Sequence, residues 1–199
     1  MKLLRKLYDW ILTWADKPFG GIFLFFLSFI EACVFPLPPD PLLIALVLGH
    51  RKKFLKFAAL CTVGSVLGGL FGYFIGYQLW HLTSEFFFNY VFPANSEILF
   101  DKLQVNYSNH SFGIVFISGF TPIPYKIFTI SSGVFKIPIF GFIIASIIGR
   151  GARFFLVSAL VAKYGNHIKN FIDKYFNILT IAFTIAIIAG FFVLKFFMH

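Results

Sequence analysis

The chain has 199 residues, of which 59% are apolar and only 13% are charged, and phenylalanine alone accounts for 31 positions. A soluble domain is roughly 45–50% apolar and about 25% charged, and a chain of this length leaves much of its surface in water. The composition therefore predicts an integral membrane protein and disfavours a soluble enzyme, a disordered chain or a disulfide scaffold. The net charge of +9 comes without a basic helix or a base-reading module, so no nucleic acid is expected as a partner.

The first segment, residues 1–17, has a helical period, with leucine and tryptophan on one face and charged side chains on the other. This pattern predicts an amphipathic helix that lies in the membrane interface, although an amphipathic helix packed against protein would show the same pattern. Charged residues interrupt the segment, so a cleaved signal peptide is not expected.

A proline-broken apolar segment follows, and it predicts a re-entrant hairpin. Residues 18–35 are apolar but short, and the next apolar run, 42–49, is far shorter than the ~20 residues that a spanning helix needs. The prolines between the runs remove backbone donors and block continuation of a helix. These turn residues are Pro36, Pro38, Pro39 and Pro41. Broken backbone is tolerated at membrane depth only where it is buried in protein or lines a polar cavity.

Residues 54–80 are long and apolar enough to span a membrane with some tilt, and with the hairpin they complete a first unit over 18–80. Small residues recur at every fourth position of this span, namely Gly64, Gly68, Gly72 and Gly76. Such spacing lets helix backbones approach closely. It predicts a packing face that serves equally well within one chain or between the chains of a homo-oligomer.

The second half of the chain repeats this design. A second hairpin over 112–137 turns at Pro122 and Pro124, about 85 residues after the first turn, and a glycine-bearing span over 139–162 follows it. The last apolar run, 176–198, predicts a third spanning helix. The expected segments of this half are an external interfacial segment (81–111), the second repeat (112–162), and a basic stretch with a last transmembrane helix (163–199).

The basic residues predict opposite orientations for the two units. If the first hairpin is re-entrant, the N-terminus and the basic cluster at 51–56 face the same side, as the positive-inside rule prefers. The segment 81–111 then lies outside, the second hairpin enters from outside, and the lysines after residue 162 lie inside. We therefore expect an all-α, multi-pass single membrane domain with two inverted repeats, a cytoplasmic N-terminus and an external C-terminus. Internal repeats with broken helices point to a transporter.

Five ionisable residues fall in apolar or re-entrant segments: Glu31, Asp40, Lys126, Arg150 and Arg153. An unpaired charge near the bilayer centre costs about 2.5–3.5 kcal/mol, so such groups pair, face a water-filled cavity or become neutral, and they are functional candidates. A carboxylate balanced between burial and a nearby cation binds and releases protons near neutral pH, which makes the two acids candidates for proton coupling. Guanidinium groups suit phosphate, so the arginines and the lysine are candidates for an anion site. The alternative is structural, with the arginines neutralising the acids and holding the repeats together.

No feature of the sequence indicates an enzyme, a cofactor or a metal. No nucleophile–base pair, phosphate-binding loop or dinucleotide fingerprint occurs, and the histidines and cysteines lack metal-ligand spacing. Cys33 and Cys61 lie in apolar stretches and are expected to be small buried hydrophobes.

Three motifs in order resemble the DedA family, which is related to the SNARE-associated Golgi proteins with the VTT domain. They are Glu31 with the PLPPDP turn, the glycine motif Gly68, Gly72, Tyr73 and Gly76, and the segment from Gly119 to Lys126 that leads to Gly133. The last of these looks most like the short YqaA-like branch. The resemblance covers roughly residues 18–165.

The resemblance implies inverted re-entrant hairpins, residence in the bacterial inner membrane and proton-dependent translocation of undecaprenyl phosphate or phospholipids. It also implies that Glu31 and Asp40 form the family's acidic pair. The better-studied branch has two arginines around the second turn, whereas this chain has Gly119 or Thr121 at the first position and Lys126 at the second. Arg150 is the candidate for the missing charge.

Together these features predict a membrane transporter or flippase of a phosphate-bearing lipid, coupled to protons. Lys126, Arg150 and Arg153 would hold the phosphate, and Glu31 and Asp40 would carry protons. Two other classes fit the same residues: a small-ion or proton antiporter, and a non-catalytic scaffold for membrane-protein assembly.

Overall fold

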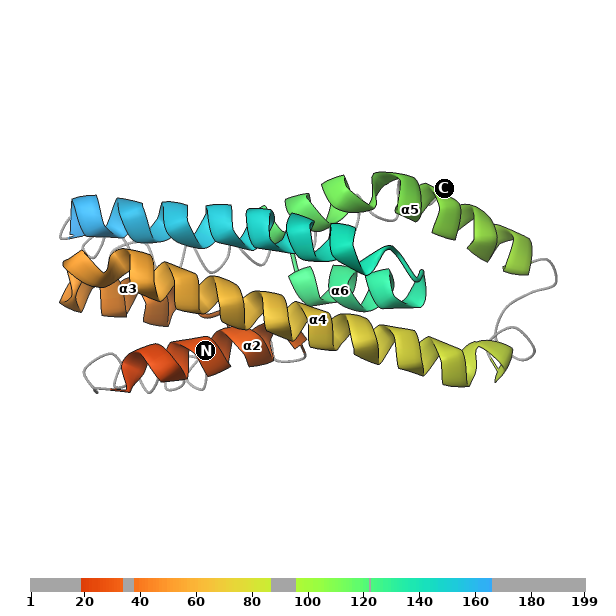
Figure 1. The fold of residues 1–199 in the computed structure, drawn as a ribbon, viewed down its shortest axis with the longest axis horizontal. Coiled ribbons are helices and arrows are strands. Elements are labelled where there is room, and N and C mark those ends of the chain that lie inside the picture. Colours follow the sequence, from red (N-terminus) through yellow and green to blue (C-terminus); the bar gives the residue numbers. More distant parts are fainter. Residues whose placement is uncertain (1–18, 34–37, 87–95, 122, 166–199) are drawn as a thin grey trace, which may run out of the picture.

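The computed structural model describes residues 19–33, 38–86, 96–121 and 123–165, and the regular secondary structure of these ranges is entirely helical (Figure 1). The all-helical fold class is thereby confirmed. The expected helices over 1–17 and 176–198 lie outside the described residues, as do Pro36 and Pro122.

Two long helices run along the length of the molecule (Figure 1). The first is α4 (Phe54–Phe86), preceded by the short 3-10 helix η1 (Arg51–Lys53). The second, Ile139–Gly165, is drawn in teal to blue in Figure 1 and is called the 139–165 helix below. Among the described residues, these two helices are long and apolar enough to cross a membrane, judged by length and composition. Both continue for several residues past the ends that the sequence predicted.

The two short apolar helices of the first half are α2 (Gly20–Cys33) and α3 (Asp40–Gly49). Proline is favoured in the first turn of a helix, because its ring presets φ and the missing N–H has no intrahelical partner there. Pro39 and Pro41 flank Asp40 at the start of α3. The Asp40 carboxylate also suits the positive end of the helix dipole, so the helix after the proline break begins at Asp40, two residues before the apolar run that the sequence indicated.

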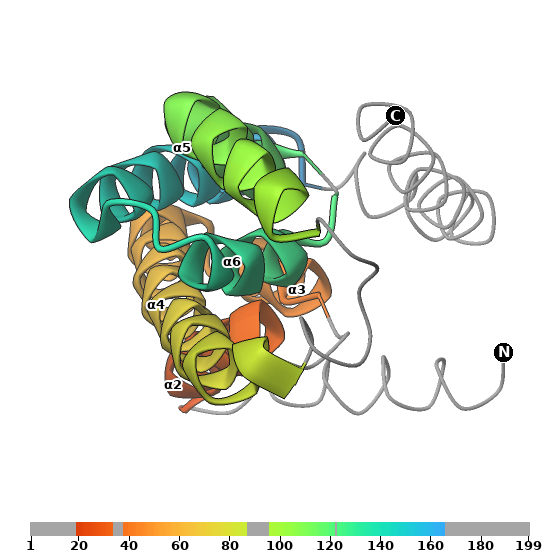
Figure 2. The same ribbon diagram turned by 90° about the vertical axis from the view of Figure 1, so that its right-hand side faces the viewer.

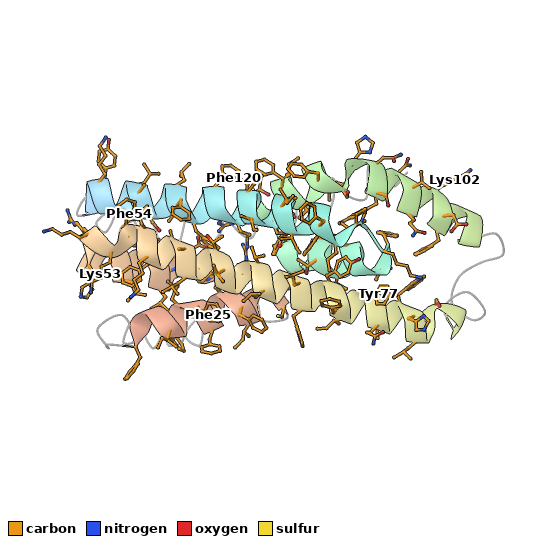
Figure 3. All side chains as sticks on the ribbon, in the orientation of Figure 1. Phe25, Lys53, Phe54, Tyr77, Lys102 and Phe120 are labelled. Atoms are coloured by element: carbon orange, nitrogen blue, oxygen red, sulfur yellow. The ribbon has the colours of Figure 1, made fainter. Side chains whose placement is uncertain are left out.

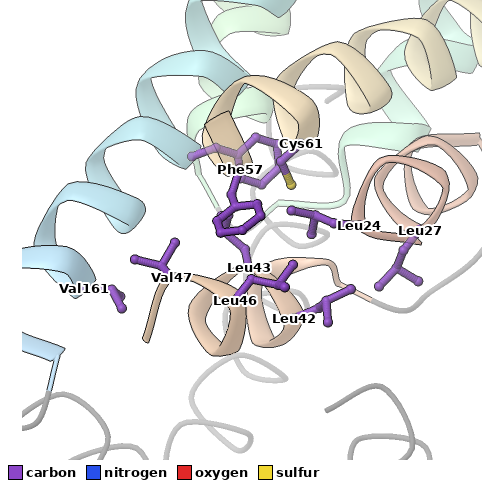
Figure 4. Close-up of a cluster of buried hydrophobic side chains, with 10 residues drawn as sticks. Leu24, Leu27, Leu42, Leu43, Leu46, Val47, Phe57, Cys61 and Val161 are labelled. Atoms are coloured by element: carbon purple, nitrogen blue, oxygen red, sulfur yellow. The ribbon is translucent and has the colours of Figure 1, made fainter. Parts of the chain in front are cut away.

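A cluster of buried apolar side chains joins α2 and α3 to both long helices (Figure 4). Its members are Leu24, Leu27, Leu42, Leu43, Leu46, Val47, Phe57, Cys61, Phe154 and Val161. The cluster holds the start of α3 beside the 139–165 helix, which positions the acidic residue at that helix end.

In the second half, α5 (Ser96–Phe120) is followed by the shorter α6 (Tyr125–Val134). Helix α5 continues past residue 111, where the sequence predicted the external segment to end. Its polar side chains reach α6 and the loop behind it. Gln104 Nε2 donates to the carbonyl of Phe135 at 3.0 Å, and Tyr107 Oη donates to the carbonyl of Phe128 at 3.2 Å. The polarity of this segment therefore reflects contacts with α6.

The remaining helices lie beside opposite halves of α4 (Figure 1). Helices α2 and α3 accompany the half in which α4 begins, whereas α5 and α6 accompany the half in which it ends. In Figure 2, α5 and α6 lie in the upper part and α2 in the lower part, and α4 packs against both α2 and α6. The ends of α2 and α5 both lie toward the middle of the molecule.

Large apolar side chains are exposed along the outer faces of the long helices. On α4, Val63, Leu67, Phe71 and Phe74 follow one another at helical spacing, and each is 43–53% exposed. Soluble monomers rarely expose continuous apolar surface of this kind. Lysines lie at both ends of the molecule, as Figure 3 shows for Lys53 at one end and Lys102 at the other.

Candidate functional site

The candidate site is built around Arg150, a buried side chain near the middle of the 139–165 helix. Arg150 is 3% exposed. Its Nη2 donates to Oε2 of Glu31 on α2, and its Nε donates to Oγ of Ser65 on α4. An ionised side chain in such surroundings needs both a counter-charge and hydrogen-bond partners. Arg150 has both, from two different helices.

Aromatic rings hold the same guanidinium from other sides. The Cζ atom of Arg150 lies 4.6 Å from the ring centroid of Tyr125 and 5.1 Å from that of Phe154. A guanidinium stacked on a ring gains from the negative face of the π-system. The Tyr125 hydroxyl donates to Ser146 Oγ at 2.6 Å, which fixes the ring in place. Arg150 is therefore oriented by groups other than its acidic partner.

Arg153 lies one turn further along the same helix and forms the second ion pair. Its Nη2 donates to Oδ2 of Asp40 at 2.9 Å, and its Nη1 donates to the carbonyl oxygen of Thr121 at 3.0 Å. Asp40 opens α3, and Thr121 directly follows α5. Arg153 thus links the first half of the chain to the proline turn of the second half.

The two pairs differ in their exposure to the surface. In the Glu31–Arg150 pair, the acidic side chain is 16% exposed and the basic one 4%, whereas both side chains of the Asp40–Arg153 pair are 19% exposed. Neither pair is on open surface, so the charges are only partly screened by solvent. Of the five predicted ionisable residues, the two acids and the two arginines are thereby brought together, and the structure has the pairing that the structural alternative predicted.

Close packing on glycine brings α2 and α6 against α4. A Cβ atom at Gly68 would collide with the backbone carbonyl of Phe29 on α2, and one at Gly76 would collide with the backbone of α6. Gly133 of α6 in turn lies against the backbone of Tyr73 on α4. Small residues permit this approach because they carry little or no side chain. In this structure the packing face therefore works within one chain.

Two further glycines place the end of α5 against the 139–165 helix. A Cβ atom at Gly119 would lie 3.3 Å from the backbone nitrogen of Arg150, and one at Gly149 would lie 2.7 Å from the carbonyl oxygen of Phe116. This contact brings the carbonyl of Thr121 within reach of Arg153.

The remaining predicted site residues lie in the turns. Lys126 is half-buried in the first turn of α6, next to Tyr125, and its carbonyl accepts a hydrogen bond from Thr129 Oγ1 at 2.9 Å. Pro39 is fully buried, and Pro124 directly precedes α6.

Sequence analysis did not single out Ser65, Ser146 or the ring of Tyr125. Neutral residues in apolar helices carry no charge or periodicity that marks them as partners of an arginine. A weak signal existed for Tyr125, because it stands between a turn proline and Lys126.

The arrangement can hold an anion and exchange protons. Both guanidinium groups already bind carboxylate oxygens, and the same planar donors suit phosphate oxygens. Both carboxylates sit where protonation would release an arginine. The sequence predicted the first capacity for Lys126, Arg150 and Arg153, and the second for the two acids.

Comparison with known proteins places the chain among relatives of similar length. It is 33% identical over 195 residues to an uncharacterized protein of Haemophilus influenzae, an alignment that covers 98% of this chain and 100% of the relative. It is 33% identical over 165 residues to an uncharacterized protein of Histophilus somni, with 83% of this chain and 84% of the relative covered. No protein-family model matches the chain, and no solved structure does. The chain belongs to the family that these two proteins represent.

Proposed function

We propose that the protein is a multi-pass membrane transporter or flippase that moves a phosphate-bearing lipid, coupled to protons. The observation that carries this proposal is that the buried Arg150 and the partly buried Arg153 each bind a carboxylate from the broken first hairpin. Charged groups at membrane depth are expensive and mark substrate or proton pathways. Undecaprenyl phosphate and phospholipids are the candidate substrates, as the resemblance to the DedA family implies.

The membrane setting is supported by the outer surface and by the long helices. The apolar row from Val63 to Phe74 on α4 suits contact with lipid tails, and both long helices have the length and composition of spans. The exposed lysines at 52, 53 and 56 stand at one end of α4 and suit a cytoplasmic interface. We place the protein in the bacterial inner membrane, with a cytoplasmic N-terminus and an external C-terminus.

In this proposal the α2–α3 pair and the pair formed by the end of α5 with α6 are re-entrant hairpins that enter from opposite faces. Their positions along opposite halves of α4 support that architecture. Broken helices that meet near the bilayer midplane are the usual place of a transporter's substrate site. The ion pairs lie where the ends of α2 and α5 and the start of α3 converge on the 139–165 helix.

The experiment uses protein in liposomes that carry a fluorescent polyprenyl phosphate, a fluorescent phospholipid or the matching polyprenol without phosphate. Translocation is followed by quenching of the outer leaflet. We expect the wild type to move at least one phosphate-bearing lipid and not the polyprenol. Arg150→Gln should abolish this movement, because it removes the guanidinium at the centre of the site.

Phe71→Ala is the matched control, because Phe71 lies on the outer face of α4 and is 53% exposed. The proposal would be contradicted if the folded wild-type protein moved neither of the two phosphate-bearing lipids. An Arg150→Gln protein that translocates lipid as fast as Phe71→Ala would also contradict it.

One observation favours a second function, that of a non-catalytic scaffold. The Glu31–Arg150 and Asp40–Arg153 pairs join helices from both halves of the chain, so they also act as structural links. If the protein is a scaffold, Glu31→Gln should lower the free energy of unfolding, and neither the wild type nor the variant should translocate lipid. The translocation assay therefore separates the two functions.

A further inference from the structure

We propose that the carboxylates of Glu31 and Asp40 occupy the substrate's phosphate site in this state, and that lipid phosphate binds by displacing them as they take up protons. This inference rests on the proposed function and adds the order of events at its site. Each carboxylate then occupies the position that a phosphate oxygen takes when the lipid is bound.

The first step of the argument is that each arginine has one acidic partner and one uncharged partner. Arg150 also binds Ser65, and Arg153 also binds the carbonyl of Thr121. In addition, the rings of Tyr125 and Phe154 flank Arg150. Loss of a carboxylate therefore leaves each guanidinium oriented, with a donor directed at the vacated position. A receptor that is held in place in advance binds an anion with little reordering.

The second step concerns charge. Protonation of Glu31 alone would leave Arg150 buried with no counter-charge, and entry of phosphate alone would place two anions on one guanidinium. Both states are strongly unfavourable in partly buried surroundings. Joint arrival of a proton and a phosphate charge leaves the net charge of the site unchanged. A phosphate with one negative charge then displaces one carboxylate with uptake of one proton, and a dianion displaces both with uptake of two.

The groups around the acids are consistent with this exchange. Four charged or titratable groups act on Glu31: Arg150 from the 139–165 helix, Tyr125 from α6, Cys33 from α2 and Cys61 from α4. Arg153 and Cys61 act on Asp40. The arginines are the cations in this set. When a carboxylate is displaced, its arginine is therefore the group that would bind the phosphate.

The consequence is a defined direction of coupling. Phosphate and protons occupy the site together, so they cross the membrane in the same direction. Binding of phosphate weakens as pH rises, by about tenfold per pH unit for each proton taken up on binding.

The test is calorimetry of farnesyl phosphate binding to the full-length protein in detergent, in two buffers with different enthalpies of ionisation. The difference between the buffers gives the number of protons taken up per ligand bound. Farnesol, which lacks the phosphate, is the control ligand. Asp101→Asn is the control variant, because Asp101 is an exposed carboxylate on α5.

We expect wild type and Asp101→Asn to take up the same number of protons. Glu31→Gln should take up about one fewer and bind about tenfold more tightly at pH 8, because it presents a neutral group that phosphate displaces at no proton cost. Protons bound by the probe itself are common to all three proteins, so the difference between them isolates Glu31.

Two results overturn the inference and leave the proposed function standing: binding of farnesyl phosphate to the wild type without proton uptake, or loss of binding in a folded Glu31→Gln protein. The wild-type measurement suffices if the variant does not fold. A wild type that binds farnesyl phosphate no better than farnesol would contradict the proposed function, and the inference with it.

Discussion

At the scale of single residues, Arg150 is the side chain on which both the stability of the helix packing and the proposed function depend. It joins α2, α4 and α6 through Glu31, Ser65 and Tyr125. Removal of one partner from a buried ion pair is more damaging than removal of both, because it leaves an uncompensated charge. Stability and function therefore respond differently to changes at this site.

We expect Glu31→Leu to lower the free energy of unfolding by about 3–5 kcal/mol, since Arg150 is then buried without its counter-charge. The double variant Glu31→Leu with Arg150→Leu should regain most of that loss, because no charge is left unpaired. Unfolding in mixed micelles with increasing denaturing detergent measures both. A double variant less stable than the single variant would show that the pair is not the source of the loss.

A second prediction compares two buried serines. Ser65 accepts from Arg150, whereas Ser158, two turns further along the 139–165 helix, is the buried side chain without a hydrogen-bond partner in the described part of the chain. Ser65→Ala should lower stability by about 1–3 kcal/mol, because it leaves a buried charged donor unsatisfied. Ser158→Ala should be neutral or slightly stabilising. Equal losses in thermal unfolding would contradict this account of the two sites.

The residues of the site show how far sequence reasoning reaches. Glu31, Asp40, Arg150 and Arg153 were identifiable because charges are rare in apolar segments. The sequence could not predict which acid pairs with which arginine, since Glu31 and Arg150 are 119 positions apart and their contact depends on how the helices pack. Ser65 gave no sequence signal, because neutral side chains are ordinary in such helices, and the signal for Tyr125 was only its position between Pro124 and Lys126.

At the scale of elements, helices α2 and α6 pack closely against α4 at its glycines. The close approaches at Gly68 and Gly76 leave no room for a side chain. The regular spacing made this face predictable, but its partners were not, because the same pattern serves packing within a chain and between chains. The extent of α5 was not predicted either, because the sequence placed Gln104 and Tyr107 in an external interfacial segment that ended at residue 111, whereas they bind α6 and its loop within a helix that continues to Phe120.

Gly76→Ala should destabilise the protein by about 1–3 kcal/mol, because the new methyl group overlaps the backbone of α6. Gly113→Ala is the matched control, since a Cβ atom on Gly113 of α5 meets nothing within 4 Å. That control should be neutral or up to ~1 kcal/mol more stable, as alanine is the better helix former. Thermal unfolding of the two variants side by side decides the matter, and similar melting temperatures would contradict the packing argument.

At the scale of the whole molecule, the proposed topology predicts that the two ends of the helical body face opposite sides of the membrane. Helices α2 and α3 lie beside one half of α4, and α5 and α6 lie beside the other, so these two helix pairs come from different halves of the chain, whereas the long helices connect the two regions. The prolines predicted where each pair breaks, and the basic residues predicted opposite orientations. The sequence could not predict that both breaks lie against the 139–165 helix, because this depends on tertiary packing.

Thiol labelling tests this sidedness. Lys52 and Lys102 are exposed near opposite ends of the chain's helical body, and the native Cys33 and Cys61 are buried. Single Lys52→Cys and Lys102→Cys variants should react with a membrane-impermeant maleimide from opposite sides of the membrane. Labelling of both from the same side of intact cells or spheroplasts would contradict the inverted topology.

The measurement that tests the central claim most directly is lipid translocation under an imposed pH gradient, with wild type and Glu31→Gln protein in liposomes. The account predicts that the wild type moves a fluorescent polyprenyl phosphate or phospholipid faster when protons flow in the same direction as the lipid. The Glu31→Gln protein should show a smaller response to the gradient. A wild-type rate that ignores the gradient, or a Glu31→Gln protein with an undiminished response, would contradict proton coupling through this carboxylate.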